Sequence, residues 1–584
     1  MAGRVQLATT GTQDVFFTEN PEYTHFIKQF RKHTNFAMYD VKHDVSGEIA
    51  YGSTVKCTIP AGSGDLLKGV RVHVDLPALN AYQGYNESIG HAIIEYVNLS
   101  IGGQLVQRIP RDWLQIYSEH YITQTKQTAL SKLIGKYPGE DSGTHVGRTY
   151  GPSERVNETP IINEYLGKAT ASTRYIVDIP FYFHNNPELA LPICALTQQE
   201  CEIEIKLSEV TDCIYGGHLA FTDSYDTGPN FTVTVVQVNG VNKYHIDGVD
   251  RPSLTLKRGS TYTFTIGKTL NEAHPFKLGR YEDGRNGGVL LGQYTTGITV
   301  STFGDITTYT FVVSDDNVLS QTRAPSVLYY YCASHPLMGG EVYIGNSNPL
   351  DKSSLKINDV SVHTELVQLD EPERVKLQSG KNEYIISQLQ RNVSQIPVST
   401  THGRDRIKCR LNFTNPVKEL YFVIARKSNS TRSVHPFDYD HSYFNYPPGI
   451  TAEHVDEDGF IILNMRYINY EHLVGLEMTL DNEVVLDKIT GNVINMRAVQ
   501  SGIHHSRTQL FRRFYSYSFA LEPERWYPTG QKNFSMIKDQ NISLILNNDV
   551  TYKRELRVYA LSNNILRIQN GAGRLIFPNG PIGD

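Results

Sequence analysis

The chain of 584 residues lacks the features that mark several large classes of protein. No apolar run approaches the roughly 18 residues that a membrane-spanning helix needs. The stretch MAGRVQLATTGTQDVFF has no apolar core, so we expect no secretory signal. Basic residues are not in excess, because 55 Lys and Arg stand against 61 Asp and Glu, for a formal net charge of −6. Proteins that coat nucleic acid present a basic face, so we expect no direct contact with nucleic acid.

Cysteine is scarce, and its spacing is irregular. The six cysteines form no Cys-x-x-Cys pair, which favours reduced thiols and synthesis inside a cell over a disulfide framework. The sequence also has no His-x-His motif, which the trinuclear centre of a multicopper oxidase would require. These absences exclude a disulfide-rich secreted domain and a multicopper oxidase.

What the chain does contain is a recurring alternation of apolar and polar residues. In VRVHVDLP the apolar side chains of Val70, Val72 and Val74 share one face, and EIEIKL and ISLIL follow the same rule. This period of two is typical of strands with one buried face. Turn signals such as AGSGD, NGAG and PNG separate the strands. The pattern predicts a mostly β protein of sandwich or barrel type, with about three domains at the usual domain size.

Two segments with a different pattern interrupt the strands. RDWLQIYSEHYI follows Pro110 at helical spacing, and Asp112 is its predicted N-cap. PERVKLQSGKNEYIISQLQ (372–390) is predicted to be a short helical or extended connector between two β units.

Several longer segments follow one another in a specific order. GSTVKCTIP, KGVRVHVDLPAL and AIIEYVNLSIGGQLVQRIP indicate three strand segments that lead into the helix. IPFYFHNNPELALPICALTQQECEIEI (179–205) indicates an aromatic strand, an Asn-Pro turn and a further strand. INDVSVHTELVQLDEPERVKL, YSYSFALEPERWYPTGQKNFSMI and RVYALSNNILRIQNGAGRLIF come later. Together these segments resemble the major capsid proteins of nucleocytoplasmic large DNA viruses, over roughly residues 15–216 and 353–578.

This resemblance implies an all-β fold with two jelly rolls in tandem. It implies a homotrimer without enzymatic activity that tiles the icosahedral shell of a virion, contacts neighbouring capsomers and minor capsid proteins, and assembles in the host cell cytoplasm. The expected organisation is a first jelly roll over 1–216, an insertion over 217–350, a closing strand and linker over 351–385, and a second jelly roll over 386–584.

The insertion has its own rhythm of strands and resembles a cupredoxin, a small Greek-key sandwich. LTLKRGSTYTFTI (254–266) matches the strand–turn–strand before the first metal ligand of that family. HPFKLG then carries His274, and YYYCASHPLMGG carries Cys332, His335 and Met338. Two imidazoles, a thiolate and a weak axial thioether are the ligands of a blue-copper site. The resemblance therefore implies copper at these four residues, and a sandwich that holds no metal is the alternative.

Two other functions remain open at this point. A copper-binding redox protein with β accessory domains would use the same four ligands, and a carbohydrate-binding jelly-roll lectin would share the fold. For the capsid function, the insertion follows EIEIKL, the seventh strand if STVKCTIP is counted as the first, and precedes the eighth. That connection is expected at the outer end of the jelly roll, where the inserted domain would meet a host surface or a glycan.

Overall fold

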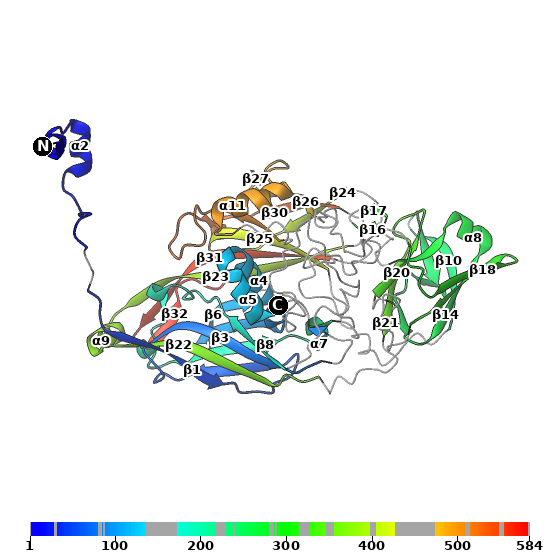
Figure 1. Cartoon of the computed structure of the whole chain (residues 1–584), viewed down its shortest axis with the longest axis horizontal. Helices are drawn as coiled ribbons and strands as arrows, with labels where there is room; N and C mark the ends of the chain where they lie inside the picture. The colour runs from blue at the N-terminus through cyan, green and yellow to red at the C-terminus, as the bar shows by residue number, and fades with distance from the viewer. Residues whose placement is uncertain are drawn as a thin grey trace.

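In the computed structural model, β-strands are the main regular structure of the chain (Figure 1). The described residues are 2–28, 32–79, 84–85, 88–135, 172–215, 229–238, 240–279, 285–286, 289–290, 293–314, 324, 327–345, 355–397, 404–426, 473–507, 514–547 and 554–581. Within these ranges, no helix combines the length and the apolar character needed to cross a bilayer.

Eight strands in two four-stranded sheets build the first jelly roll. Its first sheet has the order β1 (Phe36–Asp44), β22 (Asp359–Leu369), β3 (Leu66–Leu76) and β7 (Thr173–Asp178). Its second sheet has the order β2 (Thr54–Ile59), β8 (Cys201–Leu207), β5 (Ile94–Ile101) and β6 (Gln104–Pro110). Neighbouring strands in both sheets are antiparallel. This crossing of strands between two sheets is the jelly-roll arrangement.

The second jelly roll repeats that topology. One sheet has the order β23 (Asn382–Ile396), β31 (Arg554–Gln569), β25 (Pro416–Arg426) and β28 (Phe514–Ser518). The other has the order β24 (Arg404–Arg410), β30 (Gln540–Asn547), β26 (Leu473–Leu480) and β27 (Glu483–Leu486). Each strand therefore has a counterpart in the first jelly roll, β3 with β25 and β22 with β31 among them. The tandem double jelly roll predicted from the sequence is confirmed.

The alternating patterns fold as predicted, because each strand buries one face. Val70, Val72 and Val74 of β3 are at most 1% exposed, while the residues between them are half-buried.

The predicted strand count needs one correction. The first strand is β1, before STVKCTIP, and most of its side chains are exposed, so it lacks an apolar signature. A further correction concerns IPFYFH, where the strand ends at Asp178 and the buried aromatic residues follow in turns.

The longer helices follow the fifth strand of each jelly roll, β6 or β27, or connect the two jelly rolls. In the first jelly roll, α4 (Arg111–His120) and α5 (Gln127–Ile134) follow β6. In the second, the π-helical turn η9 (Asn495–Val499) runs into α11 (Gln500–His504) after β27. The N-cap of α4 is Pro110, so the prediction of Asp112 was wrong by two positions. α9 (Glu371–Ser379) connects β22 to β23, which begins at Asn382, inside the segment assigned to the linker.

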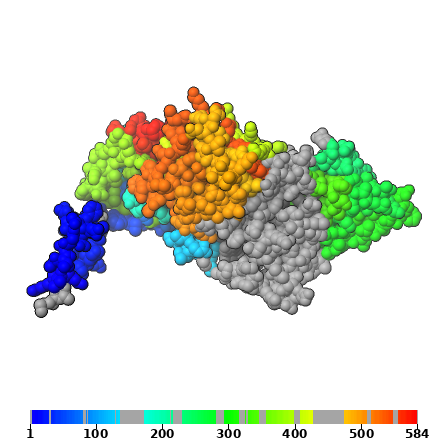
Figure 2. All heavy atoms as spheres, turned by 90° about the horizontal axis from the view of Figure 1, so that it is seen from above, coloured from blue at the N-terminus to red at the C-terminus, as the bar shows by residue number. Residues whose placement is uncertain are grey.

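Short elements complete the two jelly rolls. The N-terminal arm carries α1 (Ala2–Ala8) and α2 (Thr12–Thr18) and extends away from the body (Figures 1 and 2). The remaining short elements are β4 (Gly84–Tyr85), α3 (Ile89–Ala92), η1 (Gln124–Lys126), η3 (Pro187–Leu189), η4 (Ile193–Ala195), α7 (Val210–Cys213), β9 (Ile214–Tyr215), β29 (Lys532–Asn533), η10 (Phe534–Met536) and β32 (Ala572–Leu575).

The insertion between β8 and β22 forms a unit with two sheets of its own. The larger sheet has the order β12 (Val249–Asp250), β11 (Val241–Ile246), β10 (Asn230–Val238), β14 (Thr261–Gly267), β19 (Ile306–Val312) and β18 (Ile298–Phe303). The smaller has the order β13 (Leu254–Lys257), β21 (Gly340–Gly345), β20 (Val327–Cys332) and β15 (Phe276–Gly279). The hairpin β16 (Arg285–Asn286) and β17 (Val289–Leu290) and the helix α8 (Lys268–Ala273) complete it.

The insertion buries a core that is separate from the cores of the jelly rolls. Its aromatic and aliphatic residues form one cluster, centred on Phe264, Phe276 and Phe311, each fully buried. Two other clusters fill the jelly rolls, and the larger of them includes residues from both. Figures 1 and 2 show the insertion at the end of the long axis opposite the N-terminal arm. The insertion is thus a distinct unit at one end of the molecule.

Candidate functional site

The predicted metal ligands lie where three elements of the insertion meet. His274 is the C-cap of α8, and Cys332 is the last residue of β20. The antiparallel register pairs Cys332 with Phe276, two residues after His274. The Ala333 amide donates to the Pro275 carbonyl at 3.0 Å, so the chain leaving β20 stays beside the chain entering β15. Local pairing therefore brings the two halves of the motif together across 58 positions of sequence.

The loop after Cys332 returns tightly over β20. Leu337 has a φ of 59°, in the left-handed region that few non-glycine residues adopt. A Cβ at Gly339 would overlap the Tyr330 carbonyl oxygen, and one at Gly340 would lie 2.7 Å from the Tyr330 hydroxyl. The Gly-Gly pair is thus required for the close approach of β21 to β20. This turn holds the segment with His335 above the end of the strand that carries Cys332.

Three potential ligand atoms converge at this loop. His274 Nδ1 lies 3.1 Å from His335 Nδ1, and Cys332 Sγ lies 3.7 Å from the same His335 nitrogen. One ligand atom from each of the three residues lies within 4.8 Å of the others. Cys332 is buried, His274 is half-buried and His335 is exposed. The cluster is therefore compact and open to solvent on the His335 side.

Strand β11 supports the cluster from the neighbouring sheet. The Tyr244 hydroxyl donates to the His274 carbonyl at 2.8 Å, and the Tyr244 amide donates to the Met338 carbonyl at 3.0 Å. Asn242 Nδ2 lies 3.5 Å from His274 Nε2, which leaves Nδ1 of that ring directed at His335. Burial, and then the neighbouring His335, lower the pKa of His274, so its imidazole is neutral at pH 7. A neutral imidazole is the form that binds a metal.

Three of the four predicted ligands thus lie in one cluster. The fourth, Met338, is fully buried in the core of the insertion. A thiolate with two imidazoles suits copper or zinc, because both metals accept sulfur and nitrogen ligands. The arrangement fits a mononuclear metal site with a buried thiolate and one solvent-exposed imidazole.

A second constellation, not predicted from the sequence, lies where the two jelly rolls meet. Asp112 of α4 is 2% exposed, and its Oδ2 accepts hydrogen bonds from Arg557 at 3.0 Å and from the Tyr559 hydroxyl at 2.6 Å. Burial opposes the ionisation of Asp112, but Arg557 and then Arg111 outweigh it and lower the pKa of the carboxyl. Nearby, the Trp113 ring packs edge-on against Tyr421 of β25, with centroids 5.2 Å apart. α4 is therefore anchored to the sheet of the other jelly roll.

A buried histidine extends this seam between the jelly rolls. The two ring nitrogens of His505 lie 2.8 Å from Glu419 and 3.1 Å from Glu524. Burial by itself would lower the pKa of His505, but Glu419 and Glu524 outweigh it and raise it to about 9. The His505 ring lies against His120 of α4, 4.1 Å between centroids. His505 is therefore an imidazolium at pH 7, bridging two carboxylates beside the first jelly roll.

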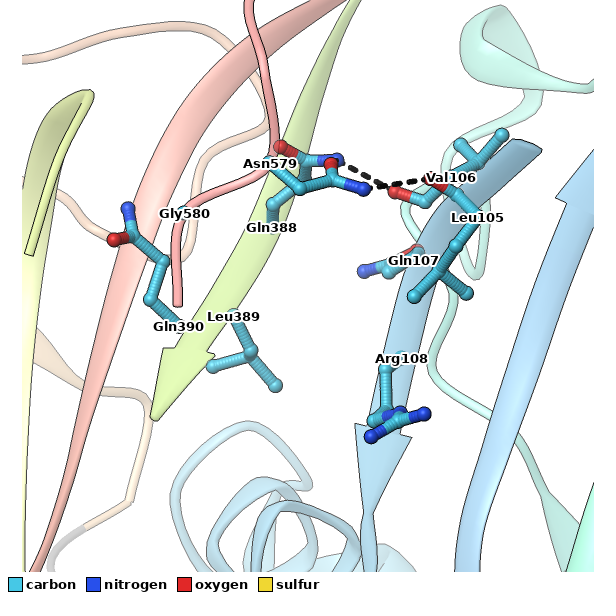
Figure 3. A pocket seen from close by; sticks show the side chains of 9 residues that line it. All are labelled: Leu105, Val106, Gln107, Arg108, Gln388, Leu389, Gln390, Asn579 and Gly580. Carbon is cyan, nitrogen blue, oxygen red and sulfur yellow. Dashed lines mark hydrogen bonds between the residues drawn. The ribbon is translucent and has the colours of Figure 1, made fainter. Parts of the chain in front are cut away.

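Side-chain amides join the jelly rolls at another part of the seam. Gln107 of β6 donates to the Ser387 carbonyl of β23 at 2.9 Å, and Gln388 donates back to the Val106 carbonyl at 2.6 Å. Asn579 donates to the Leu105 carbonyl at 2.8 Å. Figure 3 shows these side chains around a cavity of about 10 Å³, lined by Leu105, Val106, Gln107, Arg108, Gln388, Leu389, Gln390, Asn579 and Gly580. That volume has room for about one water molecule.

The seam residues were missed because their signal is weak in the sequence. Asp112 was interpreted as a helix cap. A charged residue at the start of a helix has a local explanation, and its true partner, Arg557, lies 445 positions away. A histidine next to a histidine gives no periodicity to interpret. Long-range partners of this kind appear only in the folded chain.

Two family models match the chain. The model described as major capsid protein N-terminus matches residues 24–245. The model described as large eukaryotic DNA virus major capsid protein matches residues 373–574. The first match covers the first jelly roll up to β8 and continues into the insertion as far as β11, and the second match covers most of the second jelly roll.

Relatives align over nearly the whole chain. Probable capsid protein 4 of Acanthamoeba polyphaga mimivirus is 24% identical, over 98% of this chain and 99% of its own. The major capsid protein of Paramecium bursaria Chlorella virus 1 is 22% identical, over 99% of this chain and 100% of its own.

A solved structure shows the same fold. A quasi-atomic model of the PBCV-1 virus capsid covers 95% of this chain and 100% of its own, with a TM-score of 0.54 and 19% identity. Family models, full-length relatives and fold therefore agree. The chain belongs to the major capsid proteins of large eukaryotic DNA viruses and is a structural subunit of a viral capsid.

Proposed function

We propose that this capsid subunit works as a homotrimer that tiles an icosahedral shell, without enzymatic activity. The observation that carries this proposal is the pair of jelly rolls with equivalent strand orders, joined by a buried seam. Two similar blocks per chain give six blocks in a closed ring of three chains, and a near-hexagonal ring packs into a shell by repeated contacts. A rigid seam keeps the two blocks at a constant angle, as such tiling requires.

Light scattering at micromolar concentration tests the trimer. A chain of 65.9 kDa should give a particle of about three times that mass, and the mass should persist on moderate dilution. A uniform particle of one chain mass would contradict the proposal.

The insertion is displayed on the outer surface of the shell in this proposal. The separate core of the insertion and its place at one end of the long axis support this outer position. A folded unit over residues 217–350 fits more easily outside a shell than within it. There it would contact a host surface, a glycan or a minor capsid protein. Limited proteolysis of intact particles near residues 217 and 350 should release the insertion while the shell survives. Density for the insertion on the inner face of the particle would contradict this placement.

Assembly in the host cell cytoplasm is part of the same proposal. All six cysteines are buried and free, as expected for a protein that folds in a reducing compartment. Labelled subunits should therefore accumulate and reach trimer size in the cytosolic fraction of infected cells. Trimers found first in a secretory compartment would contradict it.

A second function, copper binding by a cupredoxin-like insertion, is supported by the cluster of His274, Cys332 and His335. Two imidazole nitrogens and a thiolate would hold the ion, and the thioether of Met338 would be a fourth, weaker ligand. A copper ion would supply one-electron redox chemistry at this position. The chain's own residues would exclude water on the buried Cys332 side and leave the exposed imidazole of His335 as the point of access.

Absorption spectroscopy tests the copper proposal. Titration with Cu(II) should give an intense orange-red absorption from thiolate-to-copper charge transfer, and Cys332→Ser should abolish it. Cys409→Ser is the matched control, since Cys409 is also buried and free but belongs to β24. Equally weak binding by the wild type and Cys332→Ser would contradict the proposal.

Asn242 is the positioning residue of this site. Its contact with His274 Nε2 fixes the orientation of the ring, and removal of such a partner typically lowers metal affinity by about 10- to 100-fold. Asn242→Ala should therefore weaken copper binding while keeping the absorption maximum. Unchanged affinity in Asn242→Ala would show that the ring needs no support from β11.

A further inference from the structure

An apolar stripe on the second jelly roll is left in water. Ile494, Val499 and Ile503 are 72%, 45% and 66% exposed. They lie on the helix of residues 493–504, in which the π-helical turn η9 precedes α11. A five-residue π turn followed by a four-residue α turn places the three side chains above one another. We call these three residues the apolar stripe.

The counterpart of this helix in the first jelly roll is covered. The two helices occupy the same place in the strand order of their jelly rolls. α4 lies between β6 and β7, and the helix of residues 493–504 lies between β27 and β28. In the first jelly roll, Trp113 of α4 is 4% exposed because it packs on Tyr421 of the other jelly roll. One jelly roll thus covers the helix of its neighbour within the chain.

The geometry points to the partner of the stripe. We propose that the apolar stripe docks on the outer face of the sheet β1-β22-β3-β7 of a second copy of this chain. That sheet is the counterpart of β23-β31-β25-β28, on which α4 packs. In a closed ring of double jelly rolls, the contact that α4 makes within one chain recurs as a contact between neighbouring chains. The exposed helix of each copy therefore meets the first jelly roll of the next copy. This inference rests on the proposed trimer and names the surface that closes it.

The receiving face has an uncharged centre that suits an apolar stripe. His73 and His363 stack at 3.7 Å with an angle of 14°, and His73 pairs in register with Ile176 of β7. Burial, and then the neighbouring His363, lower the pKa of His73 to about 4. Burial, and then Lys42, lower the pKa of His363. Both rings are therefore neutral at pH 7. The charges around this centre are already paired, with Arg71 on Asp40, Asp178 and Glu365, and Arg174 on Asp75. An apolar side chain docked there would leave no charge newly unpaired.

A pair of charge substitutions tests the stripe. Val499→Lys with Ile503→Glu should reduce a trimeric wild type to single chains, or raise its dissociation constant at least 100-fold, in light scattering. The matched control is Val300→Lys with Phe303→Glu on β18 of the insertion, where exposure is 52% and 92%. The control should remain trimeric. Circular dichroism confirms that each variant keeps its β-structure.

Cross-linking identifies the receiving face without disturbing the contact. Ile503→Cys and His73→Cys are placed on two differently tagged copies that are co-expressed, so that mixed trimers assemble, and these are treated with a short bismaleimide; the six native cysteines are buried. A cross-linked pair should form only when both variants are present. If the wild type is trimeric, the stripe variant also stays trimeric and the mixed copies give no cross-link, the inference is overturned and the proposed trimer stands. A monomeric wild type would instead overturn the proposed trimer itself.

Discussion

The two jelly rolls share a topology but differ in how they cover the helix that follows β6 or β27. In the first, α4 is buried almost throughout, with Asp112, Trp113 and His120 all under 5% exposed. In the second, helix 493–504 buries Met496 but leaves the apolar stripe exposed. The helix contact of the first jelly roll is completed within the chain, and its counterpart on the second jelly roll is left for another molecule. An exposed apolar surface on an otherwise well-packed unit indicates a binding face.

The insertion differs from both jelly rolls in its independence. Its core cluster is separate, whereas the largest cluster of the molecule includes Val72 of the first jelly roll and Tyr421 of the second. Damage to the seam should therefore affect both jelly rolls together, while damage to the insertion should stay local.

The largest effect is expected at the centre of the seam. Asp112→Ala leaves Arg557 and the Tyr559 hydroxyl buried without their shared acceptor, and loss of one partner of a buried ion pair costs about 3–5 kcal/mol. Denaturant titration should show that loss in the unfolding of the jelly rolls. Glu522→Ala is the control, because its pair with Arg525 is exposed to solvent and contributes little to stability. Equal losses in the two variants would mean that the seam does not hold the jelly rolls together.

The next effect is a loss of stability on the alkaline side. The pKa of His505 is raised from 6.5 to about 9, so its charged form stabilises the fold fully below pH 6.5. That contribution is lost as the pH rises through about 9, and is on the order of 3 kcal/mol at about 1.4 kcal/mol per pKa unit. His120 acts in the opposite sense. Burial, and then the neighbouring His505, lower the pKa of His120 well below 6.5, so this residue costs stability as the pH falls below 6.5.

Unfolding free energies measured across this range check the pH prediction. The groups that face His505 are Glu419, Glu524 and His120, with Tyr121 and Tyr421 nearby. His505→Gln should be less stable at pH 6.5 and should lose the slope between pH 6.5 and 9. A slope that persists in His505→Gln would assign it to other groups.

A smaller and local effect is expected in the insertion. Gly339→Ala places a Cβ against the Tyr330 carbonyl oxygen, and overpacking of this kind costs about 1–3 kcal/mol. Gly267→Ala is the control, since its Cβ would lie 3.8 Å from the nearest atom, Leu270 Cβ. Calorimetry should show a lower melting temperature for the insertion and no change for the jelly rolls. A shift of both transitions in Gly339→Ala would show that the insertion and the jelly rolls unfold as one unit.

Much of the fold could be predicted because strands carry their own signal. Alternation in β3, β8 and β30 identified buried faces directly, and the order of segments identified the two jelly rolls. β1 was missed because its side chains are mostly exposed and its pattern is therefore weak. The spacing Cys-x-x-His-x-x-Met identified the metal candidates because its first two members lie on one short turn, and the fold brings His274 to them.

The sequence by itself determined the strand faces, the repeat of jelly rolls and the residue types of the cluster in the insertion, because these depend on local periodicity and spacing. The tertiary structure decided which charges meet. Asp112 finds Arg557 across 445 positions, and His505 finds Glu419 across 86. Such partners are chosen by the packing of one jelly roll on the other. No local pattern contains that choice, because the free energy of a buried charge depends on what surrounds it in space.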